Sequence, residues 1–193
     1  MRPIQNVILI GMKSSGKTTI GKILAQKLGL RFTDVDAEIE HLHEHQKGER
    51  LPFREIYKRY GKDCFRTLET AALRALSSKR TTLAESSAKA SFVLATGGGL
   101  PLAEENRPLL KDLGTIVFLD VAPEVLLPRI TAQGVPAFFP YPEDPARSLA
   151  ELLAVRRPIY AALAQLTVPC RSETQETIAN TIIHLLQHAS HEN

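Results

Sequence analysis

One short segment restricts the possible folds of this chain more than any other. Residues 11–18 read GMKSSGKT, which fits the pattern GxxxxGK[ST]; an apolar run at 4–10 precedes them and a helix-periodic stretch at 15–28 overlaps them. A glycine-rich loop between a strand and a helix points several backbone N–H groups inward, and the helix N-terminus adds a positive dipole. The sequence therefore predicts an α/β domain that binds the phosphates of a nucleotide.

The side chains of this loop have expected roles in phosphate binding. Lys17 is expected to reach the terminal phosphates as a point charge, and the Thr18 hydroxyl to coordinate Mg²⁺. The residues predicted to contact ATP here are Gly11, Ser14, Ser15, Gly16, Lys17, Thr18 and Thr19. No NKxD sequence occurs, which weighs against a GTPase, whereas a compact chain with a candidate lid suits a small-molecule kinase.

The rest of the chain alternates between strand-like and helix-like apolar periodicity. Strands are predicted at 4–10, 31–33, 92–95, 115–119 and around Val168. Helices are predicted at 15–28, 37–45, 53–59, 63–78, 102–111, from Pro123 to near Arg129, at 147–166 with an interruption or kink near Pro158, and after a capping box of Ser172 and Gln175. This alternation is typical of βαβ units, so we expect a mostly parallel sheet flanked by helices.

Composition narrows the class of protein further. The chain has 193 residues, 44% hydrophobic, with a net charge of +3, which suits one soluble globular domain and not a protein that binds nucleic acid. No apolar run is long enough to span a bilayer, and residues 1–6 lack the pattern of a signal peptide, so we expect a cytoplasmic protein without a membrane partner. The two cysteines, Cys64 and Cys170, are expected to be reduced.

A proline-rich segment at 131–145 differs from the rest. It contains four prolines and no Lys or Arg and connects two predicted helices. Loops of this length in compact domains are often lids over an active site, although a plain surface loop explains the composition equally well.

Two carboxylates, Asp34 and Asp36, follow the second predicted strand, at the sheet edge where α/β folds bind ligands. Residues i and i+2 of an extended segment face the same side, so one carboxylate could hold a metal while the other grips or deprotonates an acceptor hydroxyl. The alternative is structural, with Asp36 capping the helix that begins at Ala37.

Two further segments allow both a functional and a structural interpretation. Arg66 and Glu69 lie three residues apart on one helix face, and an exposed ion pair is the simpler explanation. Gly97–Gly99 follow a buried strand, where the lack of side chains lets the backbone approach a ligand closely, although a flexible turn would look the same.

Taken in order, the segments GMKSSGKTT, DVD, FRTLE and ATGGG, the proline-bearing loop and RRPIY resemble the shikimate kinase family over nearly the whole chain. The resemblance implies ATP and Mg²⁺ as cofactors, a metal shell held by Thr18 and Asp34, and shikimate as acceptor. It gives Lys17 and Asp36 catalytic roles, with Asp36 as the base. Shikimate would be bound by Asp36, Arg66, Gly98, Gly99 and Arg156, with Glu69 bracing that site and Arg129 lying against the adenine.

The same resemblance implies a fold and a division of the chain. It implies a five-stranded parallel sheet with flanking helices in a single P-loop kinase domain at 1–193. The core would comprise 1–36, 65–130 and 146–193, the substrate-binding excursion 37–64, and the lid 131–145. A monomer is expected.

The chain departs from the family pattern at its lid. Where such kinases carry an arginine in an RPLL-like run, residues 135–139 read VPAFF. This departure keeps two alternatives open beside shikimate 3-phosphorylation: a kinase of another small hydroxy acid such as gluconate or quinate, and a catalytically weak module that binds nucleotide and shikimate.

Overall fold

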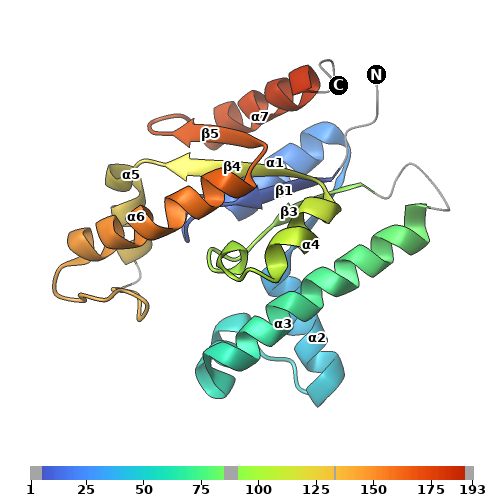
Figure 1. Cartoon of the computed structure of the whole chain (residues 1–193), viewed down its shortest axis with the longest axis horizontal. Helices are drawn as coiled ribbons and strands as arrows, with labels where there is room; N and C mark the ends of the chain where they lie inside the picture. Colours follow the sequence, from blue (N-terminus) through green and yellow to red (C-terminus); the bar gives the residue numbers. More distant parts are fainter. Residues whose placement is uncertain (1–5, 85–90, 133, 190–193) are drawn as a thin grey trace.

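A five-stranded parallel sheet forms the centre of the computed structural model, which describes residues 6–84, 91–132 and 134–189 (Figure 1). The strands are β1 (Val7–Ile10), β2 (Arg31–Asp34), β3 (Phe92–Ala95), β4 (Thr115–Val121) and β5 (Leu166–Cys170). Their spatial order is β2-β3-β1-β4-β5, and every neighbouring pair is parallel. The predicted fold class is confirmed.

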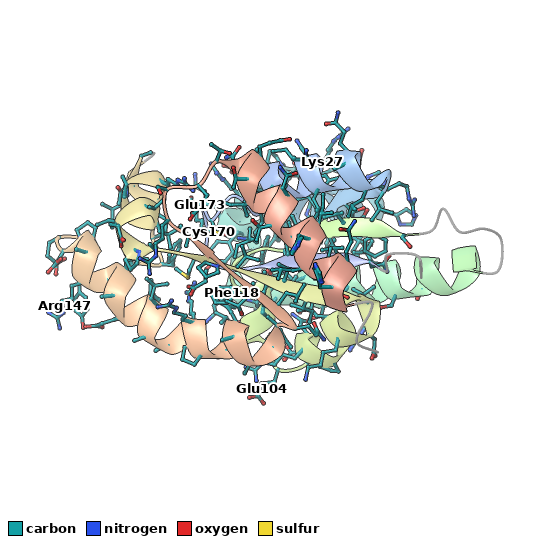
Figure 2. All side chains as sticks on the ribbon, turned by 90° about the horizontal axis from the view of Figure 1, so that it is seen from above. Lys27, Glu104, Phe118, Arg147, Cys170 and Glu173 are labelled. Atoms are coloured by element: carbon teal, nitrogen blue, oxygen red, sulfur yellow. The ribbon has the colours of Figure 1, made fainter. Side chains whose placement is uncertain are left out.

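Helices cover both faces of this sheet. Helices α1 (Lys17–Leu28) and α7 (Gln175–Ala189) pack together on one face, while α4 (Asn106–Leu113) and α6 (Pro145–Leu163) lie on the other (Figure 1). All four residues of β1 are fully buried between these layers, which is why that strand reads as a continuous apolar run. Phe118 of β4 lies in the same interior (Figure 2).

Beyond β2, helices α2 (Val35–Lys47) and α3 (Phe53–Ala84) pack against each other at one end of the molecule (Figure 1). The two helices predicted at 53–59 and 63–78 are both part of α3. Gly61 interrupts the helical backbone inside it with a φ of 80°, a left-handed value that glycine adopts readily. The break predicted between the two helices therefore coincides with Gly61, although the two helical segments meet there without a separate loop.

Several predicted helix boundaries were wrong, including both ends of the helix predicted at 37–45, which runs from Val35 to Lys47. The helix predicted at 102–111 is a short 3₁₀ turn, η2 (Leu100–Leu102), followed by α4; the helix predicted at 147–166 begins at Pro145, ends at Leu163 and continues through Pro158. The carbonyl that Pro158 leaves without its helical donor belongs to exposed Ala154, where water can satisfy it. Thr174, not Ser172, caps α7, because its hydroxyl accepts a hydrogen bond from Thr177 N at 3.1 Å.

The remaining expectations concern segments around the sheet. Helix α5 (Pro123–Thr131) follows β4 and starts at its predicted proline. Residues 4 and 5 of the first predicted strand and Gln133 of the predicted lid lie outside the described residues. Cys64 and Cys170 are both free thiols. Within the described ranges, no helix is long and apolar enough to cross a membrane.

Candidate functional site

The phosphate-binding loop connects β1 directly to α1. Gly11 and Gly16 have positive φ angles of 142° and 90°, and Ser14 adopts a φ of 64°, which is uncommon for a residue with a side chain. A Cβ atom at Gly11 would lie 2.8 Å from the backbone oxygen of Leu119, so this position has no room for a side chain. Strained backbone of this kind persists where a site requires it, and here it curls the loop into a concave cradle.

Lys17, the first residue of α1, is folded back over this loop. Its ammonium donates hydrogen bonds to Gly11 O at 3.0 Å, Met12 O at 2.6 Å and Ser15 Oγ at 3.2 Å. Burial lowers the pKa of Lys17 to about 8, although the nearby carboxylates of Asp36 and Asp34 oppose that shift. The ammonium thus lies inside the cradle, beside the two predicted carboxylates.

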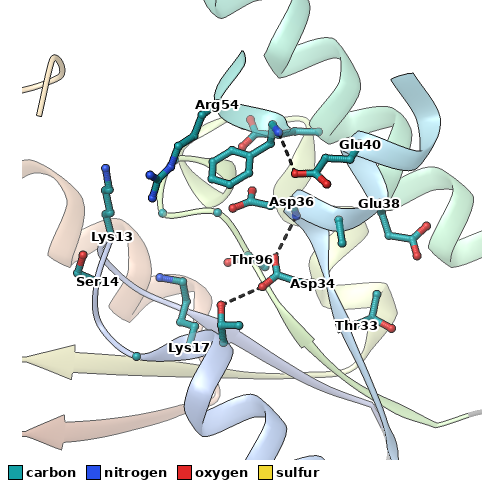
Figure 3. Close-up of a pocket in the computed structure, with 18 of the residues that line it drawn as sticks. Lys13, Ser14, Lys17, Thr33, Asp34, Asp36, Glu38, Glu40, Arg54 and Thr96 are labelled. Carbon is teal, nitrogen blue, oxygen red and sulfur yellow. Dashed lines mark hydrogen bonds between the residues drawn. The ribbon is translucent and has the colours of Figure 1, made fainter. Parts of the chain in front are cut away.

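Asp34 links the loop to the second strand and caps the next helix. Its Oδ2 accepts a hydrogen bond from Thr18 Oγ1 at 2.9 Å, and its Oδ1 accepts one from Asp36 N at 3.1 Å (Figure 3). The capping residue of α2 is therefore Asp34 and not Asp36, which corrects the structural alternative considered for Asp36.

The pair Thr18 and Asp34 fits a Mg²⁺ site. Both offer oxygen ligands, and they already lie within hydrogen-bond distance of each other at the open side of the loop. Within the described parts of the chain, no three metal-ligating side chains cluster together. Mg²⁺ usually takes one or two protein oxygens and fills its shell with phosphate oxygens and water, so a hydroxyl and a carboxylate suffice to hold it.

Asp36 faces the same space from the first turn of α2 (Figure 3). Burial and the neighbouring carboxylates of Asp34 and Glu69 raise the pKa of Asp36 to about 7, against the opposing effect of Lys17. A carboxyl group with a pKa near neutrality is suited to accept a proton from a hydroxyl at physiological pH.

Arg66 and Glu69 of α3 form an ion pair, but the pair is not the exposed one that spacing alone favoured. The Glu69 side chain is 2% exposed and the Arg66 side chain 30% exposed. Burial raises the pKa of Glu69, and the Arg66 guanidinium opposes this shift. A carboxylate held in this way orients the guanidinium, since charge-assisted pairs of Arg with carboxylate are strongly directional.

The glycines after β3 are packed against this pair and against the phosphate loop. A Cβ atom at Gly97 would lie 3.3 Å from Glu69 Oε1 and 3.5 Å from Asp36 Oδ1, and one at Gly99 would lie 2.8 Å from Arg66 Nη1. At Gly98 a Cβ atom would lie 2.9 Å from Lys13 N. At Gly98 the nearest atoms are backbone, which leaves no room for a side chain, whereas a side chain at Gly97 or Gly99 would press against Glu69 or Arg66. The loop is therefore packed among three other segments, so the flexible-turn alternative does not describe it.

Sequence reasoning missed the role of Tyr160, the last residue of RRPIY. Fully buried in α6, Tyr160 donates a hydrogen bond from its Oη to Gly98 O at 2.5 Å and so ties α6 to the glycine loop. From the same helix, Arg156 extends to Met12 Sδ, with Nη1 at 3.9 Å. The spacing of Arg156 and Tyr160, one helical turn apart, was the available signal that both face one side.

Most of these groups line one cleft of about 1210 Å³, although Tyr160 and Met12 do not. Every predicted site residue lines it except Gly11 and Ser15, which are buried within the loop itself. Arg129 contributes from α5. Lys13, Arg54 and Phe138 are among the lining residues that were not predicted as site residues. Figure 3 shows Lys13 and Lys17 on one wall and Asp36 and Arg54 on the other.

Known proteins share this arrangement of sequence and fold. The family model for shikimate kinase matches residues 13–187. A shikimate kinase from Synechococcus sp. is 40% identical over 182 residues, which cover 94% of this chain and 82% of the relative. A shikimate kinase from Neisseria meningitidis is 38% identical over 175 residues, covering 89% of this chain and 92% of the relative.

Among solved structures, a shikimate kinase from Acinetobacter baumannii in complex with shikimate superposes with a TM-score of 0.78 at 33% identity. The match covers 96% of this chain and 94% of that one. The resemblance found in the ordered motifs is thereby confirmed over nearly the full length. This chain belongs to the shikimate kinase family.

Proposed function

We propose that this protein transfers the γ-phosphoryl group of ATP to the 3-hydroxyl of shikimate, giving shikimate 3-phosphate and ADP. One observation of geometry carries the proposal. Two arginines, Arg66 and Arg156, and a carboxyl group with a raised pKa, Asp36, line the same cleft as the phosphate-binding loop. An acceptor with one carboxylate and a nearby hydroxyl matches that set of charges.

The nucleotide side of the reaction relies on the loop at 11–19. Its backbone N–H groups and the α1 N-terminus bind the phosphates, and Lys17 exchanges its loop carbonyls for terminal phosphate oxygens. Thr18 and Asp34 would hold Mg²⁺, which would supply positive charge to the phosphates of the nucleotide. Arg129 lies beside the base of the nucleotide, where a guanidinium can stack on an aromatic ring.

On the acceptor side, Arg66 and Arg156 bind the carboxylate of shikimate, while backbone groups of Gly98 and Gly99 contact its ring. Asp36 accepts the proton of the attacking hydroxyl as the new oxygen–phosphorus bond forms and the bond to ADP breaks. Phosphoryl transfer requires mostly positioning and charge stabilisation, and these groups contribute to both. In this proposal residues 37–64 bind the acceptor, residues 131–145 form the lid, and the protein acts as a cytoplasmic monomer.

An assay of ADP release coupled to NADH oxidation tests the proposal. Shikimate, quinate and gluconate are each compared with a control that lacks an acceptor. We expect shikimate to raise ADP release far above the control and above the other two acids. Equal rates with and without shikimate would overturn the proposal, and preference for quinate or gluconate would reassign the acceptor.

A further inference from the structure

The segment between Arg129 and Arg147 contains no lysine or arginine, so it offers no cation to a phosphoryl group in transfer. It places an aromatic ring at the cleft instead. Lys13 Nζ lies 5.5 Å and Arg156 Cζ 5.6 Å from the centre of the Phe138 ring, which is 36% exposed. Negative charge on the transferred group must still be balanced by positive charge from other elements.

Arg54 is a cleft residue to which the resemblance assigns no role. It is the second residue of α3, and the start of that helix is fixed to α2 because Phe53 N donates a hydrogen bond to Glu40 Oε1 at 2.9 Å. Ile56, two residues later, is fully buried against the core. The helix therefore turns Arg54 away from the core and toward the cleft, which the residue lines.

The charge of Arg54 lies close to Lys13 of the phosphate loop and to Asp36. The phosphoryl group must move between the phosphate loop and Asp36 on its way from ATP to the acceptor. In Figure 3, Lys13 extends from the phosphate loop toward the guanidinium of Arg54, and Asp36 lies between Arg54 and the metal-site residue Asp34. Burial and the positive charge of Arg54 lower the pKa of Lys13, while Asp36 opposes that effect. Two like charges converging on the cleft are stabilised when an anion lies between them.

The other cleft cations have different neighbours. Arg66 is engaged by Glu69 and lies against Gly99, and Arg156 contacts Met12 and Phe138. Lys22 lies over the ring of Phe32, with its Nζ 5.9 Å from the ring centre. Lys13 lies over Phe138, and Arg54 Cζ lies 5.7 Å from the centre of the Phe53 ring. Both residues line the cleft between the phosphate loop and Asp36.

We propose that Arg54, together with Lys13, contacts the transferring phosphoryl group and supplies the positive charge that the lid segment of this chain lacks. This inference takes its acceptor, shikimate, from the proposed function, but the contact of Arg54 with phosphate does not depend on which acceptor is used. Arg54 is then a catalytic residue contributed by the substrate-binding excursion, so docking of α2 and α3 on the acceptor also completes the charge around the phosphate.

The first test separates turnover from binding. The variant Arg54→Ala is compared with Arg54→Lys and with Lys58→Ala, which removes an exposed charge one turn further along α3. We expect Arg54→Ala to lower kcat for shikimate phosphorylation by roughly 10- to 100-fold with KM for shikimate and ATP little changed. Arg54→Lys should recover part of the loss, and Lys58→Ala should behave as wild type.

Adding a cation to the lid gives a second variant. Val135→Arg should raise kcat several-fold in the wild type, with KM for ATP little changed. In the Arg54→Ala background the same substitution should raise kcat by a larger factor, because the new arginine and Arg54 would stabilise the same negative charge. A kcat for Arg54→Ala equal to wild type would overturn the proposal. So would a rise in KM for shikimate alone, which would place Arg54 on the acceptor carboxylate.

A binding measurement without acceptor distinguishes this inference from the proposed function. Calorimetry compares the affinity of each variant for Mg·ADP with and without aluminium fluoride, which mimics the phosphoryl group in transfer. Arg54→Ala should lose about ten-fold or more in affinity for the fluoride complex and little for ADP. If Arg54→Ala loses affinity equally for ADP and for the fluoride complex, or loses none, the role of Arg54 is overturned even if shikimate is the acceptor. A loss of affinity for the fluoride complex alone would support that role even if shikimate is not phosphorylated.

Discussion

The two walls of the cleft are built in different ways. The phosphate wall comes from one continuous stretch, Gly11 to Thr19, whose shape is set by backbone torsions and whose lysine bonds to the same loop. The acceptor wall is assembled from the starts of α2 and α3, the middle of α3, the glycine loop and α6. The torsions of the first wall are specified by its local sequence, whereas the second wall exists only once distant segments have packed together.

The walls also differ in how charge is held. On the phosphate wall the Lys17 ammonium has three hydrogen-bond acceptors. On the acceptor wall, burial and neighbouring carboxylates raise the pKa of Asp36 to about 7, so the folded protein resists ionisation of that group. Burial also lowers the pKa of Lys17 to about 8, so it disfavours the charged form on both walls, but the Lys17 ammonium is compensated by acceptors of its own loop.

Removing the phosphate wall's lysine should have the largest effect. We expect Lys17→Ala to lower turnover by about 10³-fold or more, because the charge on the terminal phosphates is lost while the strand and helix around the loop remain. Steady-state kinetics and circular dichroism measure both properties. Lys27→Ala, which removes an exposed lysine of the same helix, is the control. Normal activity in a folded Lys17→Ala protein would contradict the assignment.

On the acceptor wall, Asp36→Asn should lower kcat by about 10²-fold or more, because a carboxamide cannot accept the proton of the hydroxyl. The affinity for Mg·ADP should change little, since the phosphate wall is intact. Rapid-quench single-turnover kinetics, with nucleotide affinity measured in parallel, provide the test. If the single-turnover rate of Asp36→Asn matches wild type, Asp36 is not the base.

The same substitution should stabilise the ligand-free protein in a pH-dependent way. The folded pKa of Asp36, about 7, lies above its ordinary value of 3.8, so its favourable contribution is complete below pH 3.8 and is lost as the pH rises through 7. Because asparagine stays neutral, the unfolding free energy of Asp36→Asn should exceed that of wild type by an amount that grows from pH 4 to 7, reaching roughly 1 to 3 kcal/mol. Urea titrations in EDTA measure it; a difference that does not change with pH would contradict the raised pKa.

Outside both walls, in α5, Arg129→Ala should have the smallest effect. The loss of stacking on the base should weaken ATP binding by about 2- to 30-fold and leave kcat at saturating ATP nearly unchanged. Calorimetry with ATP, and with tripolyphosphate as a control that lacks a base, locates the effect. Equal weakening for both ligands would show that Arg129 acts on phosphate and not on adenine.

The contrast between the walls also explains what sequence could predict. The order of elements, β3 at 92–95 and the phosphate loop follow from local patterns of apolar residues and glycine. The burial of Glu69 does not, because spacing on a helix cannot show which neighbours will cover it. Arg54 was missed for the same reason: only the packing of α3 on α2 turns it toward Lys13.

Calorimetric titration with shikimate and with Mg·ADP tests directly whether the acceptor wall binds a carboxylate and whether the two walls act separately. Arg66→Ala should weaken shikimate binding by about 2 to 5 kcal/mol, because one arm of a desolvated charge contact is lost, while Mg·ADP affinity stays within about two-fold of wild type. Arg156→Ala should do the same, and it provides the test if removal of Arg66 from buried Glu69 impairs folding. If either folded variant binds shikimate as tightly as wild type, the acceptor wall does not recognise a carboxylate through that arginine, and the account of this site is wrong.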